Sequence, residues 1–200
     1  ERGAGQQFRS ATPLPPLAAI GALDDLETTR RAGELTAREA LALGVNWIFA
    51  PVADLDIEPR NPIVGTRAFG ADPGRVSEHV VAWIEGCRAA GALACAKHFP
   101  GHGRTTADSH VELPRVDADR AALEADLAPF WAAVRAGVDS VMTAHVAFPA
   151  LDPSGLVATL SPAILGGLLR GELGFRGIIV TDAMIMEGVL ESGHGEATAA

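Results

Sequence analysis

Four stretches of the chain repeat one pattern: an amphipathic helix, a glycine, a short apolar strand and a polar loop. The strands are expected over residues 45–50, 92–96, 140–144 and 177–181. Strands that are apolar throughout and alternate with helices are typical of a parallel sheet buried on both faces. An open doubly wound sheet and a (β/α)8 barrel of the TIM type both contain this arrangement.

The second unit carries the clearest helix signals. Asp72 can cap the helix N-terminus, Pro73 suits the first helical position, and Gly91 follows the expected end. The other three helices are expected over residues 24–43, from 117 to the glycine at 137, and from 161 onward. His79 lies on the second helix and is expected to face solvent.

A complete barrel needs eight strands and about 250 residues, whereas this chain has 200 residues and four clearly predicted strands. The polar, glycine-rich opening over residues 1–9 is typical of the loop after a further strand. We therefore expect residues 1–200 to be a single, partial barrel domain, cut at both ends.

Composition excludes several classes of protein. Apolar residues make up 48% of the chain, enough for a sizeable core, and the net charge of −9 disfavours binding to a nucleic-acid backbone. No apolar run reaches the roughly 18 residues of a membrane span. Cys87 and Cys95 do not make a disulfide framework and are expected as two buried thiols. A cytoplasmic monomer is expected, with export left open because the chain starts at Glu1 and not at Met.

Polar residues follow every expected strand. Sites in parallel α/β folds form where strands end, so these residues are expected to lie around one site. They are Asp54 and Asp56 after the first strand, Lys97, His98 and His102 after the second, His145 after the third and Asp182 after the fourth. Asp54 is expected to hydrogen-bond neighbouring loops, and His145 fits a core role and a substrate contact equally well.

The loop after the second strand is long, running from about residue 98 to 116, against the usual 2–6 residues. Asp108 and His110 are two positions apart in it, so their side chains can meet in a turn. An aspartate beside an imidazole fixes the tautomer and favours the imidazolium. Such a pair can donate and accept a proton near neutral pH.

Several motifs resemble bacterial β-N-acetylhexosaminidases of glycoside hydrolase family 3. They are ERGAGQQFR at 1–9, APVADLD at 50–56, TRAFGADP at 66–73, KHFPGHG at 97–103, DSH at 108–110 and TDAMIMEGV at 181–189. The resemblance spans nearly the whole chain, and the loop carrying the Asp-x-His pair separates this branch from the β-glucosidase branch.

The resemblance implies a role for individual residues. Asp182 matches the catalytic nucleophile, His110 the acid/base and Asp108 its partner, while Arg67, Lys97 and His98 match residues that hold N-acetylglucosamine. A substrate-binding aspartate of the family precedes the position of Glu1. The opening Glu-Arg-Gly-Ala-Gly departs from the Glu-Gly-Gly-Arg-Val expected there, so the sugar-contacting arginine of that loop is displaced or missing.

The implied activity is that of a retaining exo-β-N-acetylglucosaminidase that acts on small carbohydrates derived from peptidoglycan and needs no cofactor or metal. Two alternatives stay open. A metal-dependent barrel hydrolase would use His98, His102, Asp108 and Asp182 as ligands. A sugar-binding remnant without turnover would follow if the missing strands are essential.

Overall fold

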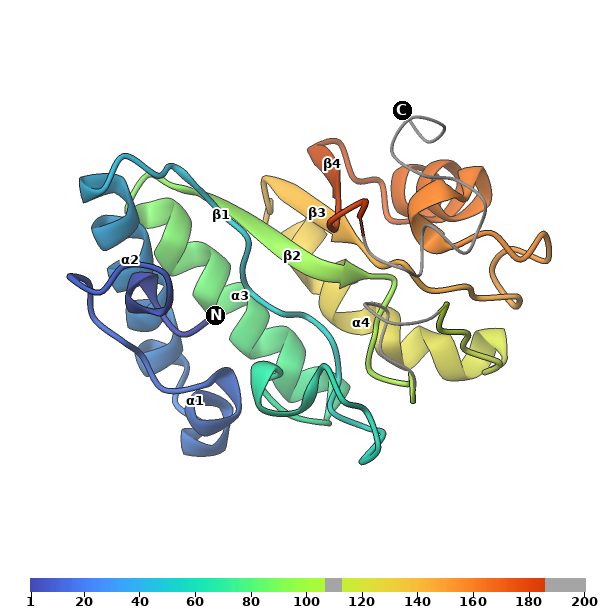
Figure 1. Ribbon diagram of the computed structural model, residues 1–200, viewed down its shortest axis with the longest axis horizontal. Coiled ribbons are helices and arrows are strands. Elements are labelled where there is room, and N and C mark those ends of the chain that lie inside the picture. The colour runs from blue at the N-terminus through green and yellow to red at the C-terminus, as the bar shows by residue number, and fades with distance from the viewer. Residues whose placement is uncertain (107–112, 186–200) are drawn as a thin grey trace.

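The computed structural model describes residues 1–106 and 113–185. Its centre is a parallel sheet of four strands, β1 (Trp47–Ile48), β2 (Leu93–Phe99), β3 (Ser140–Thr143) and β4 (Ile178–Thr181), in the order β1-β2-β3-β4 (Figure 1). All four predicted strands and the parallel sheet are confirmed. A barrel is not closed by the described residues, so barrel closure stays a prediction.

The strand β1 is shorter than its predicted range, because the amide of Val45 donates to the carbonyl of Ala40 and the amide of Ala50 donates to the carbonyl of Ile48, both at 2.9 Å, and not to β2. The chain nevertheless keeps bonding to β2 beyond this point. The amide of Cys95 donates to the carbonyl of Ala50 at 2.9 Å, and the amide of Ala53 donates to the carbonyl of Lys97 at 2.6 Å. These bonds carry the segment with Asp54 to the C-terminal end of β2.

Helices connect the strands. They are α1 (Leu17–Leu23), α2 (Leu26–Ala42), α3 (Pro73–Ala89), α4 (Arg120–Arg135) and the π-type helix η4 (Ala163–Glu172), with short 3-10 turns η1 (Ala4–Gln6), η2 (Gly65–Arg67) and η3 (Ala158–Leu160). Asp72 caps α3 as predicted, accepting from the amide of Arg75 at 2.8 Å, and Ser161 Oγ accepts from the amide of Ile164 at 3.0 Å.

The helix predicted over residues 24–43 is confirmed as α2, and a further short helix that was not predicted, α1, precedes it. Asp24 adopts a left-handed conformation with φ of 55° and ends α1, and Asp25 begins α2 by accepting from the amides of Glu27 and Thr28. Because aspartate tolerates the left-handed region and also caps helices well, two consecutive aspartates can end one helix and start the next.

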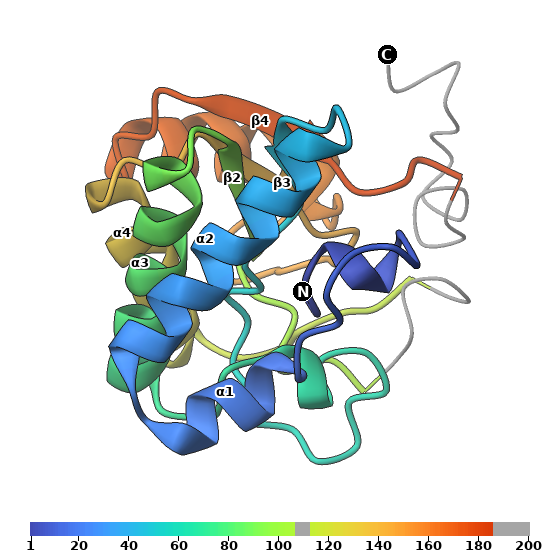
Figure 2. The same cartoon turned by 90° about the vertical axis from the view of Figure 1, so that its left-hand side faces the viewer.

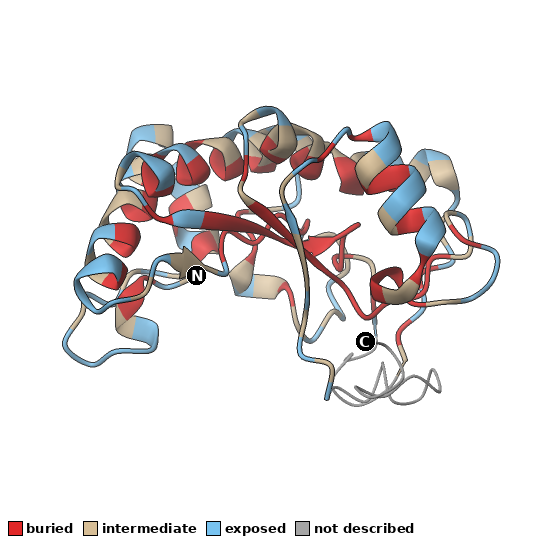
Figure 3. Ribbon diagram, turned by 90° about the horizontal axis from the view of Figure 1, so that it is seen from above, coloured by how far each residue is buried: buried red, intermediate tan, exposed pale blue. Residues whose placement is uncertain are grey.

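The helices α2, α3 and α4 lie together on one side of the strands (Figure 2), and their buried faces point toward the sheet (Figure 3). The core between the layers includes Val80, Trp83 and Ile84 of α3, with Ala94 and Ala96 of β2. Cys87 and Cys95 are both buried free thiols, as predicted. Across residues 1–106 and 113–185, no helix is long and apolar enough to cross a membrane.

The expectation that His79 faces solvent is wrong. The side chain is buried between α3 and α2, where Nδ1 lies 2.8 Å from Thr29 Oγ1 and the ring stacks on Phe69. His79 lies three positions after Val76 and four before Trp83, so it belongs to the buried stripe of α3. Burial lowers the pKa of this imidazole.

Candidate active site

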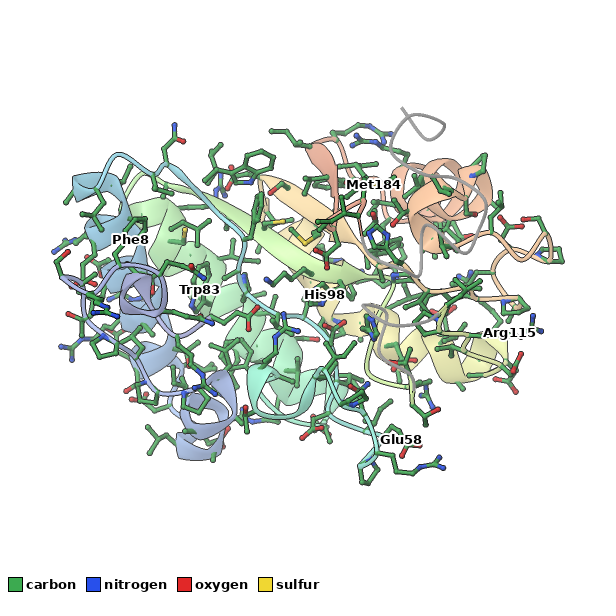
Figure 4. All side chains as sticks on the ribbon, viewed as in Figure 1. Phe8, Glu58, Trp83, His98, Arg115 and Met184 are labelled. Atoms are coloured by element: carbon green, nitrogen blue, oxygen red, sulfur yellow. The ribbon has the colours of Figure 1, made fainter. Side chains whose placement is uncertain are left out.

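The opening segment, the end of β2 and the loops that follow β1, β2 and β4 meet around a polar cavity of about 290 Å³. Its lining comprises Glu1, Gln6, Ile63, Arg67, Lys97, His98, His102 and Asp182. Figure 4 shows His98 near the end of β2, with Met184 marking the segment after β4. The structure thus brings together four residues proposed from the sequence, Arg67, Lys97, His98 and Asp182. A larger hollow of about 400 Å³ lies among the outer helices, between side chains such as Leu26 and Val81, away from the strand ends.

Two cations of the cavity share one carboxylate. Glu1 accepts two hydrogen bonds from the Arg67 guanidinium, at 2.7 and 2.8 Å, and its Oε1 also lies 2.7 Å from Lys97 Nζ. Burial alone would raise the pKa of Glu1, but the hydrogen bonds and charges of Arg67 and Lys97 hold it well below its ordinary value. The glutamate raises the pKa of Arg67 in return. This cluster keeps both cations at the wall of the cavity.

Asp54 bonds from beneath the cavity to two histidines, His98 at the end of β2 and His102 in the loop that follows. Its side chain is fully buried, and Oδ2 lies 2.7 Å from His98 Nδ1. Its other oxygen accepts from the amides of His98 at 3.2 Å and His102 at 2.7 Å. Burial acts to raise the pKa of Asp54, but the imidazole of His98 and these bonds lower it. The expectation that Asp54 bonds to neighbouring loops is confirmed.

His98 presents its second ring nitrogen to the cavity. Nε2 lies 3.8 Å from Asp182 Oδ2 and 3.5 Å from Arg67 Nη2. Asp182 comes directly after β4, and its Oδ1 accepts from the amide of Ala183 at 2.8 Å. The Asp182 side chain is 31% exposed. A carboxylate is therefore available at the cavity, close to an imidazole and a guanidinium.

His145 lies beside the cavity and not among the residues that line it. It is 1% exposed, with Nε2 3.1 Å from the carbonyl of Ala183 and Nδ1 2.8 Å from Thr159 Oγ1. Burial lowers the pKa of His145, so the neutral ring is favoured. Because a carbonyl only accepts, Nε2 carries the proton of the neutral ring, and Nδ1 faces the Thr159 hydroxyl, which also lies 3.1 Å from the carbonyl of Ala144. His145 thereby supports the segment that follows Asp182.

The loop after β2, called the β2 loop, is described over residues 100–106 and is held on two sides. His102 Nδ1 lies 2.7 Å from Thr105 Oγ1, and Asn61 Nδ2 donates to the carbonyl of His102 at 2.8 Å. Burial lowers the pKa of His102 to about 4. Arg104 Nε donates to Asp126 Oδ2 of α4 at 2.5 Å. Asp108 and His110, the predicted acid/base pair, lie outside the described residues.

Two members of this arrangement were not singled out from the sequence. Glu1 was read as part of a polar opening loop, although its acidic side chain precedes a glycine-rich turn. Asn61 lies in the long polar segment after the first strand, where its spacing gives no sign that it bonds to the β2 loop. Within residues 1–106 and 113–185, no group of three or more His, Cys, Asp or Glu side chains is placed to hold a metal ion.

The chain matches the description "Glycosyl hydrolase family 3 N terminal domain" over residues 1–200. It is 42% identical over 201 residues to a protein named beta-hexosaminidase from Alkalilimnicola ehrlichii, an alignment that covers 96% of this chain and 57% of that relative. The chain spans 29–57% of the length of the first curated relatives it matches.

Solved structures agree with this relationship. The glycoside hydrolase family 3 beta-N-acetylglucosaminidase from Paenibacillus sp. str. FPU-7 superposes with a TM-score of 0.90 at 41% identity, over 96% of this chain and 37% of that chain. NagZ from Neisseria gonorrhoeae, solved in complex with N-trifluoroacetyl-D-glucosamine, superposes with a TM-score of 0.81 at 36% identity, over 88% and 53% of the two chains. The family match over all 200 residues, together with relatives at about 40% identity, shows that the chain belongs to glycosyl hydrolase family 3, within its N-terminal domain.

Proposed function

We propose that the protein containing this domain is a retaining exo-β-N-acetylglucosaminidase that removes terminal N-acetylglucosamine from small sugars such as peptidoglycan fragments. The observation that carries the proposal is the convergence of Asp182, His98, Lys97 and Arg67 on one polar cavity at the strand ends. Named hexosaminidases at about 40% identity support the class of substrate.

Asp182 is the proposed nucleophile. It lies at the end of a strand, which suits a group that must be placed accurately against the anomeric carbon. Its exposed carboxylate faces a cavity that also contains cationic and imidazole groups. The attacking form of such a residue is the ionised carboxylate.

Arg67, Lys97 and His98 are the proposed sugar-binding groups. Their N–H groups can donate to hydroxyl oxygens and to the carbonyl oxygen of an N-acetyl group. Glu1 holds the two cations by short hydrogen bonds, so little side-chain freedom is lost when the sugar binds.

His110, assisted by Asp108, is the proposed acid/base. In the first step Asp182 forms a bond to the anomeric carbon as the glycosidic bond breaks, and the imidazolium of His110 protonates the departing oxygen. In the second step neutral His110 takes a proton from water, whose oxygen attacks the anomeric carbon and releases Asp182. Both residues lie outside the described residues, so this role rests on the family resemblance.

We further propose that the sheet is part of a (β/α)8 barrel. Its strands follow one another in chain order, and α2, α3 and α4 lie on one side. A doubly wound sheet instead reverses its strand order and carries helices on both faces. The edge strands β1 and β4 are where further strands would pair.

The test uses the intact protein and nitrophenyl N-acetyl-β-glucosaminide. We expect hydrolysis with the β-anomer of N-acetylglucosamine as the first product, detected by proton NMR, and continued activity after treatment with a chelator. The matched nitrophenyl β-glucoside should react more slowly. Absence of turnover, or the α-anomer as the first product, would reject the proposal.

A further inference from the structure

We infer that Asp54 is a positioning residue that keeps His98 protonated at Nδ1, so that Nε2 is the ring atom presented to the sugar. The inference rests on the proposed function in one respect, namely that a sugar occupies the cavity. Asp54 itself does not line the cavity and acts through the histidine.

Asp54 is held in place by burial and by its hydrogen bonds. The side chain is fully buried, and its three hydrogen bonds go to the end of β2 and the loop that follows: His98 Nδ1 at 2.7 Å and the amides of His98 and His102 at 3.2 and 2.7 Å. A buried carboxylate with such partners is held in one orientation. It therefore fixes the imidazole and the backbone that bears it at the same time.

The hydrogen bond between Asp54 and His98 fixes which ring nitrogen carries a proton. An ionised carboxylate only accepts hydrogen bonds, so His98 Nδ1 must be the donor whether the ring is neutral or charged. Nε2 is then the nitrogen that gains or loses a proton. The neutral ring has its lone pair at Nε2, directed at the cavity.

His98 Nε2 has two polar neighbours in the cavity, and neither is in close contact. Arg67 Nη2 lies at 3.5 Å and Asp182 Oδ2 at 3.8 Å, distances that leave both contacts weak and replaceable. A sugar hydroxyl can thus donate to neutral Nε2 or accept from the protonated ring. Among the described residues, the charged and titratable groups around His98 include Asp54 below it, His145 beside the cavity, and Glu1, Arg67, Lys97, His102 and Asp182 around the cavity.

The variant Asp54→Asn tests the assignment in the intact protein. The amide keeps the shape of the carboxylate but can donate to Nδ1, which removes the restriction on the tautomer. Nitrogen-15 NMR of the imidazoles, with His98→Gln to assign the signal, reports which nitrogen carries the proton on the alkaline side of the titration of the ring. Asp152→Asn is the matched control, because Asp152 is also a buried carboxylate but bonds to Ser154 and Ser161, away from the cavity.

In the wild type we expect the proton at Nδ1 of neutral His98. In Asp54→Asn we expect the Nε2-protonated tautomer to appear and kcat/KM to fall by about 10- to 100-fold, the cost typical of a displaced binding group. Asp152→Asn should change neither. A purely structural role for Asp54 would lower the melting temperature without altering the tautomer.

Two results would overturn the inference. One is neutral His98 protonated at Nε2 in the wild type, a measurement that needs no variant to fold. The other is a folded Asp54→Asn protein with an unchanged tautomer and kcat/KM. If the wild type cleaves no N-acetylglucosaminide, the proposed function fails, and the NMR result alone decides the role of Asp54.

Discussion

The loops after β1 and β4 each bring an aspartate to His98, one on either side of its ring. Asp54 is fully buried and accepts from three N–H groups, two of His98 in β2 and one of His102 in the loop that follows. The Asp182 side chain is 31% exposed, accepts from the adjacent amide of Ala183, and turns its other oxygen toward the cavity.

This difference separates two tasks that one residue type can perform. A carboxylate whose acceptor sites are used inside the protein orients its neighbours, because moving it would leave several buried donors unpaired. A carboxylate with an oxygen at a cavity can form a new bond without first breaking the interior network. Asp54 therefore positions other groups of the site, whereas Asp182, after β4, is the group proposed to react.

The largest effect is expected at Asp182. The substitution Asp182→Asn keeps the shape of the side chain but removes the attacking charge, so kcat should fall by about 10⁴-fold or more. Ligand binding and the melting temperature should remain near those of the wild type. The checks are steady-state kinetics, ligand titration and thermal unfolding. Near-normal kcat would place the nucleophile elsewhere and break the comparison.

A smaller loss is expected for His110→Ala, and it should depend on the substrate. General acid catalysis typically contributes about 10²- to 10⁴-fold. A nitrophenolate leaving group needs little protonation, so the loss should fall mainly on substrates with poor leaving groups. Comparing kcat/KM for nitrophenyl and disaccharide substrates measures this. Equal losses on both would show that His110 is not the acid, and Asp108→Asn should follow the pattern of His110→Ala more weakly.

His102 tests the buried part of the site, because its burial makes the stability of the fold depend on pH. Burial lowers its pKa from 6.5 to about 4, so between these values the unfolded chain binds a proton that the folded protein excludes. Folding stability should therefore fall as the pH drops from 6.5 to 4, by up to about 3 kcal/mol from this group. In His102→Asn the free energy of unfolding should depend less on pH. Urea unfolding measured between pH 4 and pH 6.5 checks this. A slope identical to that of the wild type would contradict the assignment.

The smallest effect concerns the close approach of two loops. A Cβ on Gly103 would lie 2.0 Å from the carbonyl oxygen of Leu55, next to Asp54. Gly103→Ala should cost about 1–3 kcal/mol of unfolding free energy and displace the two histidines that bond to Asp54. Gly166→Ala is the matched control, because nothing lies within 4 Å of its added Cβ in η4. Equal stabilities of the two variants would show that the loops are not tightly apposed.

The order of elements could be predicted from the sequence because apolar strands, caps and glycines recur in each unit. The short helix α1 could not, since it has only seven residues and no side chain caps its N-terminus. The burial of His79 could have been predicted from its spacing to Val76 and Trp83, which lie on the same buried face of α3.

The candidate site was predictable at the level of which residues meet, because the ends of parallel strands share one edge. Arg67, Lys97, His98 and Asp182 all reach the cavity. Spacing could not show that His145 would bond to Thr159, a residue on a later segment, and to the carbonyl of Ala183. Nor could it show that Glu1 would bridge two cations from distant segments, since that contact depends on the folded loops.

The most direct test of the central claim is to trap the proposed intermediate on Asp182. Intact protein is treated with an activated fluorinated N-acetylglucosaminide that slows the second step, then digested and analysed by mass spectrometry. We predict one added sugar per molecule, attached to Asp182 and absent from Asp182→Asn. An adduct on another residue, or turnover of the probe with inversion at the anomeric carbon and no adduct, would contradict the account.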